Sequence, residues 1–206
     1  MKSACPWPVN KMALFAMNEA DSIESIMPRE REVFLMERIA SGDQHAMEEL
    51  IELWKMPMFR FFLRSLNHHE DAEDLTQRVF IRIYRSAERY LPHAKFSTWI
   101  FTIARNLLID EIKKRKRRPQ MVFDEYIERA GEVEGGRSAE LTEILMQQLD
   151  LIPENHRTAL LLRVQRELSY REIAEVMQST EASVKTWIHR ARLDLRKSLS
   201  NLRQTQ

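Results

Sequence analysis

The chain has 206 residues, enough for one or two domains, and its single cysteine, Cys5, excludes an internal disulfide and a zinc site of paired cysteines. Only four glycines, beside many leucine, isoleucine, methionine, glutamate and arginine residues, favour an all-α protein. No apolar run approaches the roughly 20 residues that span a bilayer, so we expect a cytoplasmic protein without membrane insertion. The net charge of +1 conceals basic blocks at residues 113–118 and 185–197 and an acidic stretch at 124–140.

Residues 1–29 are predicted to form a poorly ordered leader. Their short apolar patch, Met12 to Met17, lacks the extended hydrophobic run and the small-residue cleavage site of a signal peptide. Met12, Met17 and Met27 remain alternative starts of translation.

Apolar residues at helical spacing predict a helix over residues 31–40 and another over 44–66, separated by the break Ser41-Gly42-Asp43. Pro57 lies inside the second of these. Because proline lacks a backbone N–H, we expect it to kink or restart that helix.

Asp71 is predicted to cap a third helix, with Asp74 at its third position. The apolar face of this helix comprises Ala72, Leu75, Val79, Ile83 and Ala87. Ser97 is predicted to cap a long fourth helix that ends near Arg117, before Pro119. The fourth helix has a broad apolar face, formed by Trp99, Ile100, Ile103, Ala104, Leu107, Leu108 and Ile112.

Residues 120–138 are acidic, contain two adjacent glycines and have little periodicity, which predicts a flexible linker. Helical spacing resumes near Ala139. The sequence therefore predicts two small helical domains, residues 30–119 and 139–206, the second with about four packed helices.

Residues 168–198 predict a helix-turn-helix. Ser169 and Glu172 form a capping box, so the first helix should begin at Tyr170, and Ser179 or Thr180 can cap the second. The outer face of the second helix is basic and polar: Lys185, Thr186, His189, Arg190, Arg192 and Arg196. Such a face suits phosphate neutralisation and base readout in a DNA groove, although a structural helix bundle with a solvated face remains the alternative.

Six consecutive cations, residues 113–118, are too dense for ordinary pairing along one helix and indicate an anionic partner such as DNA phosphate. Asn106 and Asp110, four residues apart, can meet base edges or simply each other. Trp99 is interpreted as a core residue rather than a wedge between bases, because it shares the apolar face with Ile103.

Four segments together resemble the second and fourth conserved regions of bacterial sigma-70 family sigma factors, specifically the small extracytoplasmic-function type. The segments are DAEDLTQRVFIRIYRSAERY (71–90), FSTWIFTIARNLLIDEIKKRKRR (96–118), LIPENHRTALLLRVQRELSYREIAEVM (151–177) and TEASVKTWIHRARLDLRK (180–197). The resemblance extends over residues 30–202, and the order and spacing of the segments make it far more specific than a lone helix-turn-helix.

The resemblance implies a subunit that binds core RNA polymerase, directs it to promoters and helps to open the DNA. In such proteins the helix of the first segment docks on the clamp coiled coil of the largest polymerase subunit, and the fourth region contacts the flap. The implied polymerase interface comprises Asp71, Asp74, Gln77 and Arg78. Arg78 stands where the family often has an acid, so one contact there is expected to differ, and a solvated face remains the alternative.

The resemblance also implies two promoter contacts. The long fourth helix and the loop before it, residues 90–96, would bind the minus-ten element and hold an unstacked base. The implied minus-ten residues are Tyr90, Lys95, Phe96, Arg105, Asn106, Asp110, Lys113, Lys114 and Lys116. The implied minus-thirty-five residues are Ser183, Lys185, Thr186, His189 and Arg190. Gln178 and Ala182 occupy places where relatives often have glycine, so the angle of the turn is expected to differ.

No nucleophile motif or phosphate-binding glycine loop is present, so we expect no enzymatic activity and no cofactor. The adjacent His68 and His69 cannot converge on one ion from a helix, and no metal site is expected.

By resemblance alone, an anti-sigma factor is an expected partner. The alternative function is a dimeric helix-turn-helix regulator that does not replace the sigma subunit, and copurification with polymerase separates the two.

Overall fold

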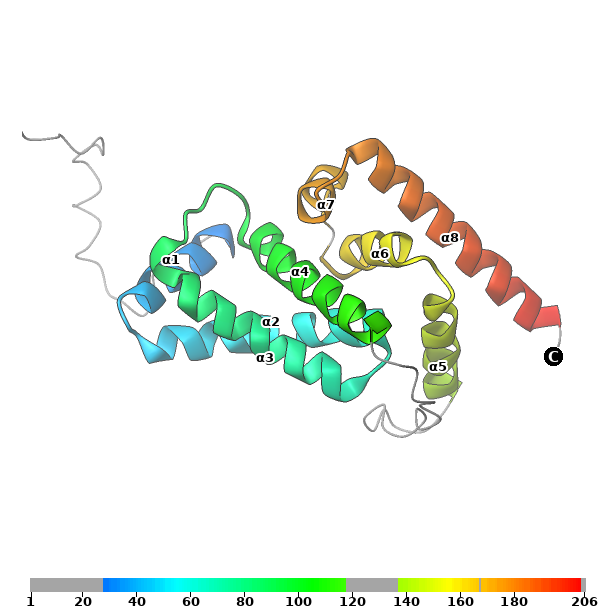
Figure 1. Cartoon of the computed structure of the whole chain (residues 1–206), viewed down its shortest axis with the longest axis horizontal. Coiled ribbons are helices and arrows are strands. Elements are labelled where there is room, and N and C mark those ends of the chain that lie inside the picture. The colour runs from blue at the N-terminus through cyan, green and yellow to red at the C-terminus, as the bar shows by residue number, and fades with distance from the viewer. Residues whose placement is uncertain (1–27, 118–136, 167, 205–206) are drawn as a thin grey trace, which may run out of the picture.

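The computed structural model describes residues 28–117, 137–166 and 168–204, so nearly all of the predicted leader and of the predicted linker lies outside the described residues. Residues 28 and 29, assigned to the leader, belong to the first helix. Within these ranges every regular element is helical, which confirms the predicted all-α fold class (Figure 1). No helix among the described residues has the length and apolarity to cross a membrane.

The first two helices, α1 (Pro28–Ala40) and α2 (Gln44–Leu66), are joined by a short turn. Gly42 adopts a positive φ of 88°, which favours glycine, and the Asp43 carboxylate caps α2 by accepting from the N–H groups of His45 and Ala46. Pro57 lies within an unbroken α2, so the predicted restart is wrong. Trp54 and Met58, on either side of Pro57, are both buried, and their packing offsets the lost backbone hydrogen bond.

The next two helices are α3 (His69–Ser86) and α4 (Phe96–Arg117), with a 3-10 turn, η2 (Ala87–Arg89), between them. Asp71 is not the cap of α3: His68 Nδ1 accepts from the Asp71 N–H at 3.0 Å and takes that role. Ser97 is likewise wrong as the cap of α4, because the helix already includes Phe96.

Helices α1 to α4 enclose a core of large side chains. The predicted apolar face of α3 is buried throughout, as are four of the seven residues predicted for α4. Aromatic rings meet edge to face, as at Phe61 and Phe101, whose centroids lie 5.4 Å apart. This core fixes the orientation of α3 and α4, the two helices that carry most of the predicted polymerase and minus-ten residues.

The remaining helices are α5 (Arg137–Asp150), α6 (Glu154–Arg166), α7 (Tyr170–Met177) and α8 (Glu181–Gln204). Helix α5 begins two residues before the predicted Ala139. The predicted start of α7 at Tyr170 is confirmed, and both hydrogen bonds of the capping box between Ser169 and Glu172 are formed. Gln178 ends α7 with φ of 50°, a left-handed conformation in a position where a glycine would be unstrained.

Removing this cap gives a first test of the fold. Ser169→Ala should lower the free energy of unfolding by about 1 kcal/mol, because the Glu172 N–H loses its acceptor at the start of α7. Urea denaturation followed by circular dichroism measures the change. Ser200→Ala removes a hydroxyl that bonds only to the carbonyl oxygen of Arg196 within exposed α8, and it should leave stability nearly unchanged.

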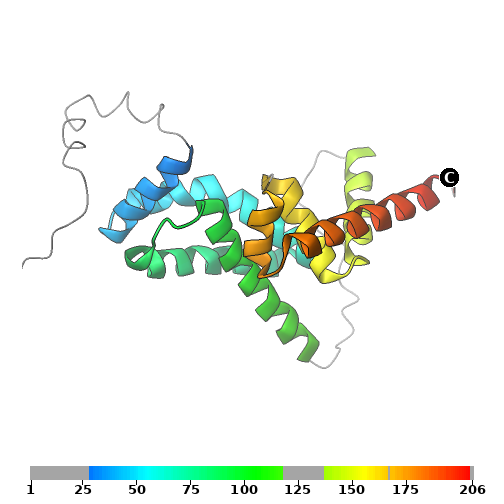
Figure 2. The same ribbon diagram turned by 90° about the horizontal axis from the view of Figure 1, so that it is seen from above.

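The two groups of helices pack against each other. Figures 1 and 2 both show α7 beside the N-terminal half of α4, while the C-terminal half of α8 projects away from the rest of the molecule. Contacts also join α2 to α6. The chain is therefore in a closed arrangement, with the helix-turn-helix lying against the helix predicted to bind the minus-ten element.

Candidate nucleic-acid interface

Helix α8 presents the predicted DNA-reading face to solvent. Thr180 Oγ1 caps the helix by accepting from the Ser183 N–H at 3.2 Å, which settles the choice between Ser179 and Thr180. The inner residues Val184, Ile188 and Ala191 are buried against the helix-turn-helix core. On the outer face, the exposed residues are Lys185, Thr186, His189, Arg190, Arg192 and Arg196.

Two of the predicted minus-thirty-five residues also have local structural roles. Ser183 is half-buried, and its hydroxyl lies 2.9 Å from Thr180 Oγ1, so it supports the cap. Lys185 Nζ lies 5.6 Å from the centroid of the Tyr170 ring on α7, within reach of a cation–π contact. This contact holds the ammonium at the start of α8, whereas Arg190 lies further along the helix.

The basic end of α4 divides into inward and outward cations. Arg115 pairs with Asp71 on α3 and Lys114 lies 3.2 Å from the carboxylate of Glu111, a residue only 5% exposed. The prediction that the run is too dense for pairing is therefore wrong for these two residues. The others that the structure describes, Lys113, Lys116 and Arg117, are exposed and have no ion pair within 4 Å among the described residues.

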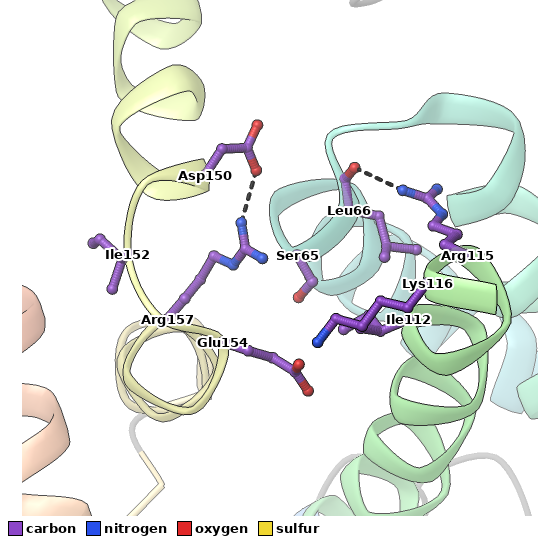
Figure 3. A pocket seen from close by; sticks show the side chains of 9 residues that line it. All are labelled: Ser65, Leu66, Ile112, Arg115, Lys116, Asp150, Ile152, Glu154 and Arg157. Carbon is purple, nitrogen blue, oxygen red and sulfur yellow. Dashed lines mark hydrogen bonds and ion pairs between the residues drawn. The ribbon is translucent and has the colours of Figure 1, made fainter. Parts of the chain in front are cut away.

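A pocket of about 460 Å³ lies beside this end of α4, between the two groups of helices (Figure 3). Residues of α2 and α4 line one side, and residues at the end of α5 and the start of α6 line the other. Across the pocket, Figure 3 shows the carboxylate of Glu154 and the ammonium of Lys116 pointing toward each other. Asn67 Nδ2 donates to the carboxylate of Asp150 at 2.9 Å and so bridges the two groups.

A second pocket, of about 740 Å³, opens at the predicted base-binding loop. Tyr90 and Trp99 line it with their rings 4.7 Å apart, and Trp99 is half-buried against the core. Trp99 thus packs as predicted and also has one side on the pocket. Phe96 is only 2% exposed and packs on Trp54 and Trp99, so the prediction that its ring contacts DNA is corrected: the ring belongs to the core.

Three arginines of this second pocket are absent from the predicted site. Arg82, Arg85 and Arg89, from α3 and η2, line the pocket and are exposed. Their spacing of three and four residues already places them on one face of the predicted third helix, a signal available in the sequence. They make the wall of the pocket basic, as a site for nucleic acid requires.

Of the remaining predicted minus-ten residues, Lys95 and Arg105 lie near acids of the second group of helices. Lys95 Nζ forms an ion pair with Glu172 on α7 at 2.7 Å. Burial lowers the pKa of Arg105 from its usual value, and the nearby Glu154 carboxylate opposes that shift. Asp110 is exposed with Arg82 Nη2 at 4.0 Å, and Asn106 is half-buried. Lys95 and Arg105 therefore face acids of α6 and α7 in this arrangement.

The predicted polymerase face of α3 is polar at one end and apolar at the other. Asp71 is engaged by Arg115, while Asp74 accepts from Arg78 at 3.4 Å and Gln77 is exposed. Continuing the same helical stripe, Ile81 and Tyr84 are 49% and 59% exposed. Sequence reasoning overlooked these two residues, which add apolar contact area beside the charged groups.

A helix-turn-helix whose second helix has a basic outer face is typical of a DNA-binding protein. The family model described as Sigma-70 region 2 matches residues 50–118, and that described as Sigma-70, region 4 matches residues 142–195. The chain belongs to the sigma-70 family of RNA polymerase sigma factors, of the ECF type. It is a sigma factor, which directs RNA polymerase to promoters.

Curated relatives of this type cover most of the chain. The ECF RNA polymerase sigma factor SigW of Bacillus subtilis is 32% identical over 81% of this chain and 96% of that protein. The ECF RNA polymerase sigma-E factor of Escherichia coli K12 is 30% identical over 77% of this chain and 88% of that protein.

Solved structures support the fold. CnrH, in complex with the cytosolic domain of CnrY, has a TM-score of 0.64 and 22% identity, covering 83% of this chain and 98% of that one. The sigma factor RpoE of Bartonella quintana, in complex with the anti-sigma factor NepR, has a TM-score of 0.65 and 22% identity, covering 74% of this chain and 96% of that one.

Proposed function

We propose that residues 30–119 bind core RNA polymerase and the minus-ten element, while residues 139–206 bind the minus-thirty-five element. Residues 120–138 would connect the two parts. The observation that carries this division is the presence of two separate basic surfaces, the outer face of α8 and the α3–α4 surface, on two different groups of helices. Their order along the chain agrees with the matches to region 2 and region 4.

For the minus-ten element, the proposed contacts are Tyr90, Lys95, Arg105, Asn106, Asp110 and the basic end of α4. Opening a base pair costs a few kcal/mol, and a pocket that binds only the unstacked base offsets this cost without ATP. The second pocket, with its Tyr90 and Trp99 rings and its arginines, supplies stacking surfaces and positive charge. For the minus-thirty-five element, the proposed contacts are Ser183, Lys185, Thr186, His189 and Arg190.

For the polymerase, the proposed contact is the stripe of α3 from Asp74 to Tyr84. Replacing Asp74 with arginine and Gln77 with alanine should weaken core binding by roughly tenfold or more, because a basic helical partner would meet a cation in place of a carboxylate. Pull-down titration with purified core measures this affinity, and run-off transcription from the same mixtures should fall in parallel.

The matched control changes an acid pair on another helix. Glu48→Arg with Glu52→Ala changes exposed residues of α2. It makes the net charge more positive by at least as much as the Asp74 and Gln77 variant does, and it should leave core affinity close to that of the parent. Equal affinity of the Asp74 and Gln77 variant and the parent would remove α3 from the polymerase interface.

We also propose an anti-sigma factor as a protein partner of this chain. The supporting observation is the fold shared with RpoE of Bartonella quintana, whose structure was solved with the anti-sigma factor NepR. Inhibition of run-off transcription by a candidate anti-sigma protein, reversed when more sigma factor is added, tests it.

A further inference from the structure

We infer that acidic side chains of α6 and α7 close the free protein on itself by occupying the basic surface that the proposed function assigns to minus-ten DNA. The inference rests on that assignment. Three carboxylates carry it, Glu154, Glu172 and Glu175, each of which faces a different part of the α3–α4 surface.

Glu172 makes the most direct contact. Its Oε1 lies 2.7 Å from Lys95 Nζ, and its side chain is 15% exposed while that of Lys95 is 57% exposed. The other carboxylate oxygen accepts from the Ser169 N–H at 2.8 Å, so the capping box holds Glu172 in place. Burial raises the pKa of Glu172, but hydrogen bonds from Lys95 and Ser169 outweigh that effect and lower it overall, which keeps the carboxylate charged.

Glu175 lines the second pocket. Among the described residues that line this pocket, it is the one carboxylate, and it comes from α7 while the arginines come from α3 and η2. Arg171 Nε lies 3.4 Å from Glu175 Oε1. A negative charge thus lines the basic pocket, in a place where a DNA phosphate would otherwise be attracted.

Glu154 acts at the other end of α4. It begins α6 and points toward Lys116 across the first pocket (Figure 3). Burial lowers the pKa of Arg105, and the Glu154 carboxylate acts in the opposite direction and raises it, as a nearby negative charge does. Lys95, Arg105 and Lys116 are all proposed minus-ten contacts. In this closed arrangement, carboxylates of the helix-turn-helix half face all three of them.

This arrangement is incompatible with promoter binding by both halves at once. Elements centred at minus ten and minus thirty-five are about 25 base pairs apart, or roughly 85 Å along B-DNA. Helix α8, with 24 residues, is only about 36 Å long, and α7 just before it touches α4. Promoter binding by both halves at once therefore requires α7 to separate from α4.

The closure is weak enough to be reversed by binding. Exposed ion pairs change an equilibrium by only about 1.4-fold to fivefold each. The apparent dissociation constant for DNA equals the intrinsic value divided by the fraction of open molecules. Free protein should therefore bind promoter DNA poorly, and polymerase or any ligand that prefers the open form should expose the minus-ten surface.

The test replaces Glu154, Glu172 and Glu175 with glutamine in the full-length protein. Glutamine keeps the size of each side chain, and at position 172 its amide oxygen can still accept from the Ser169 N–H and complete the capping box. Donor and acceptor dyes at Lys55→Cys and Ser200→Cys, in a Cys5→Ser background, report the separation of the two groups of helices. A fluorescein-labelled single strand carrying the minus-ten element of a promoter recovered by run-off transcription reports DNA binding by anisotropy.

The triple variant should show lower energy transfer than the parent and should bind the single strand about tenfold more tightly. Removing three acids also raises the net charge by three, which favours DNA binding anywhere on the molecule. The matched control, Glu48→Gln with Glu52→Gln and Asp194→Asn, makes the same charge change at exposed positions outside the two pockets and their ion pairs, so affinity is compared with this control.

Two other results would overturn the inference, and they differ in what else they overturn. Unchanged energy transfer, with affinity no higher than that of the control, would refute the closure and leave the proposed minus-ten surface intact. Lower energy transfer without tighter binding than the control would show that the uncovered surface is not the minus-ten site. The proposed minus-ten role of Lys95, Arg105 and Lys116 would then be wrong as well.

Discussion

Replacing Lys113, Lys116 and Arg117 with glutamine is expected to flatten the salt dependence of promoter binding by up to about 2.7 units of log–log slope. Each phosphate neutralised by a cation contributes about 0.9 to this slope, because binding releases counterions. Between about 50 and 200 mM salt, the parent should therefore lose roughly 40-fold more affinity than the variant. Electrophoretic mobility shifts of the polymerase complex at several salt concentrations measure the two slopes.

The choice of cations follows from the structure rather than from the sequence. Lys114 and Arg115 belong to the same run but pair with Glu111 and Asp71, so their removal would leave carboxylates without partners and disturb stability. The control, Lys55→Gln with Arg60→Gln on α2, removes exposed cations outside the proposed DNA surface and should leave the slope unchanged. A slope for the triple variant equal to that of the parent would mean that the end of α4 does not contact phosphate.

Local patterns were sufficient to predict most of the fold. The stripe from Ala72 to Ala87 has the period of a helix and is buried as expected, and the capping box at Ser169 fixes the first residue of α7. Both signals act within a few residues, where spacing and hydrogen-bonding groups determine the structure. His68 escaped prediction because its ring nitrogen accepts like a serine hydroxyl only in one tautomer and one backbone conformation.

Contacts between distant segments could not be predicted in this way. The ion pairs of Lys95 with Glu172 and of Arg115 with Asp71 join residues on different helices, and neither spacing nor composition indicates which acid meets which base. Phe96 was misassigned for the same reason. The family resemblance implied a minus-ten role for it, but its ring packs against Trp54 and Trp99, residues whose positions depend on the packing of α2 against α4.

The exposed outer face of α8 was predictable, because the residues of a helix opposite its buried side face the solvent. Val184 and Ile188 are buried, and Lys185, His189 and Arg190 are exposed as a direct consequence of the helical period of about 3.6 residues. What periodicity leaves open is which of these exposed groups reads bases and which contacts phosphate. The environments of Lys185 and Arg190 differ enough to separate these roles.

Arg190→Ala is expected to relax sequence preference within the minus-thirty-five element by about 1–3 kcal/mol at one base pair while leaving the minus-ten preference unchanged. The guanidinium is exposed on the outer face of α8 and can donate two hydrogen bonds to one guanine, a geometry that no other base reproduces. Selection from a promoter library randomised at both elements, with polymerase and either protein, measures the two preferences in one experiment.

Lys185→Ala provides the matched comparison on the same helix. Its ammonium is held near the start of α8 over the Tyr170 ring and has a single point charge, so its loss should weaken binding about equally for all sequences and reduce the salt slope by about 0.9. The assignment of Arg190 is contradicted if the selected minus-thirty-five motif is the same for Arg190→Ala and the parent. In that case the arginine acts like Lys185, as a phosphate contact that positions α8 without reading the base sequence.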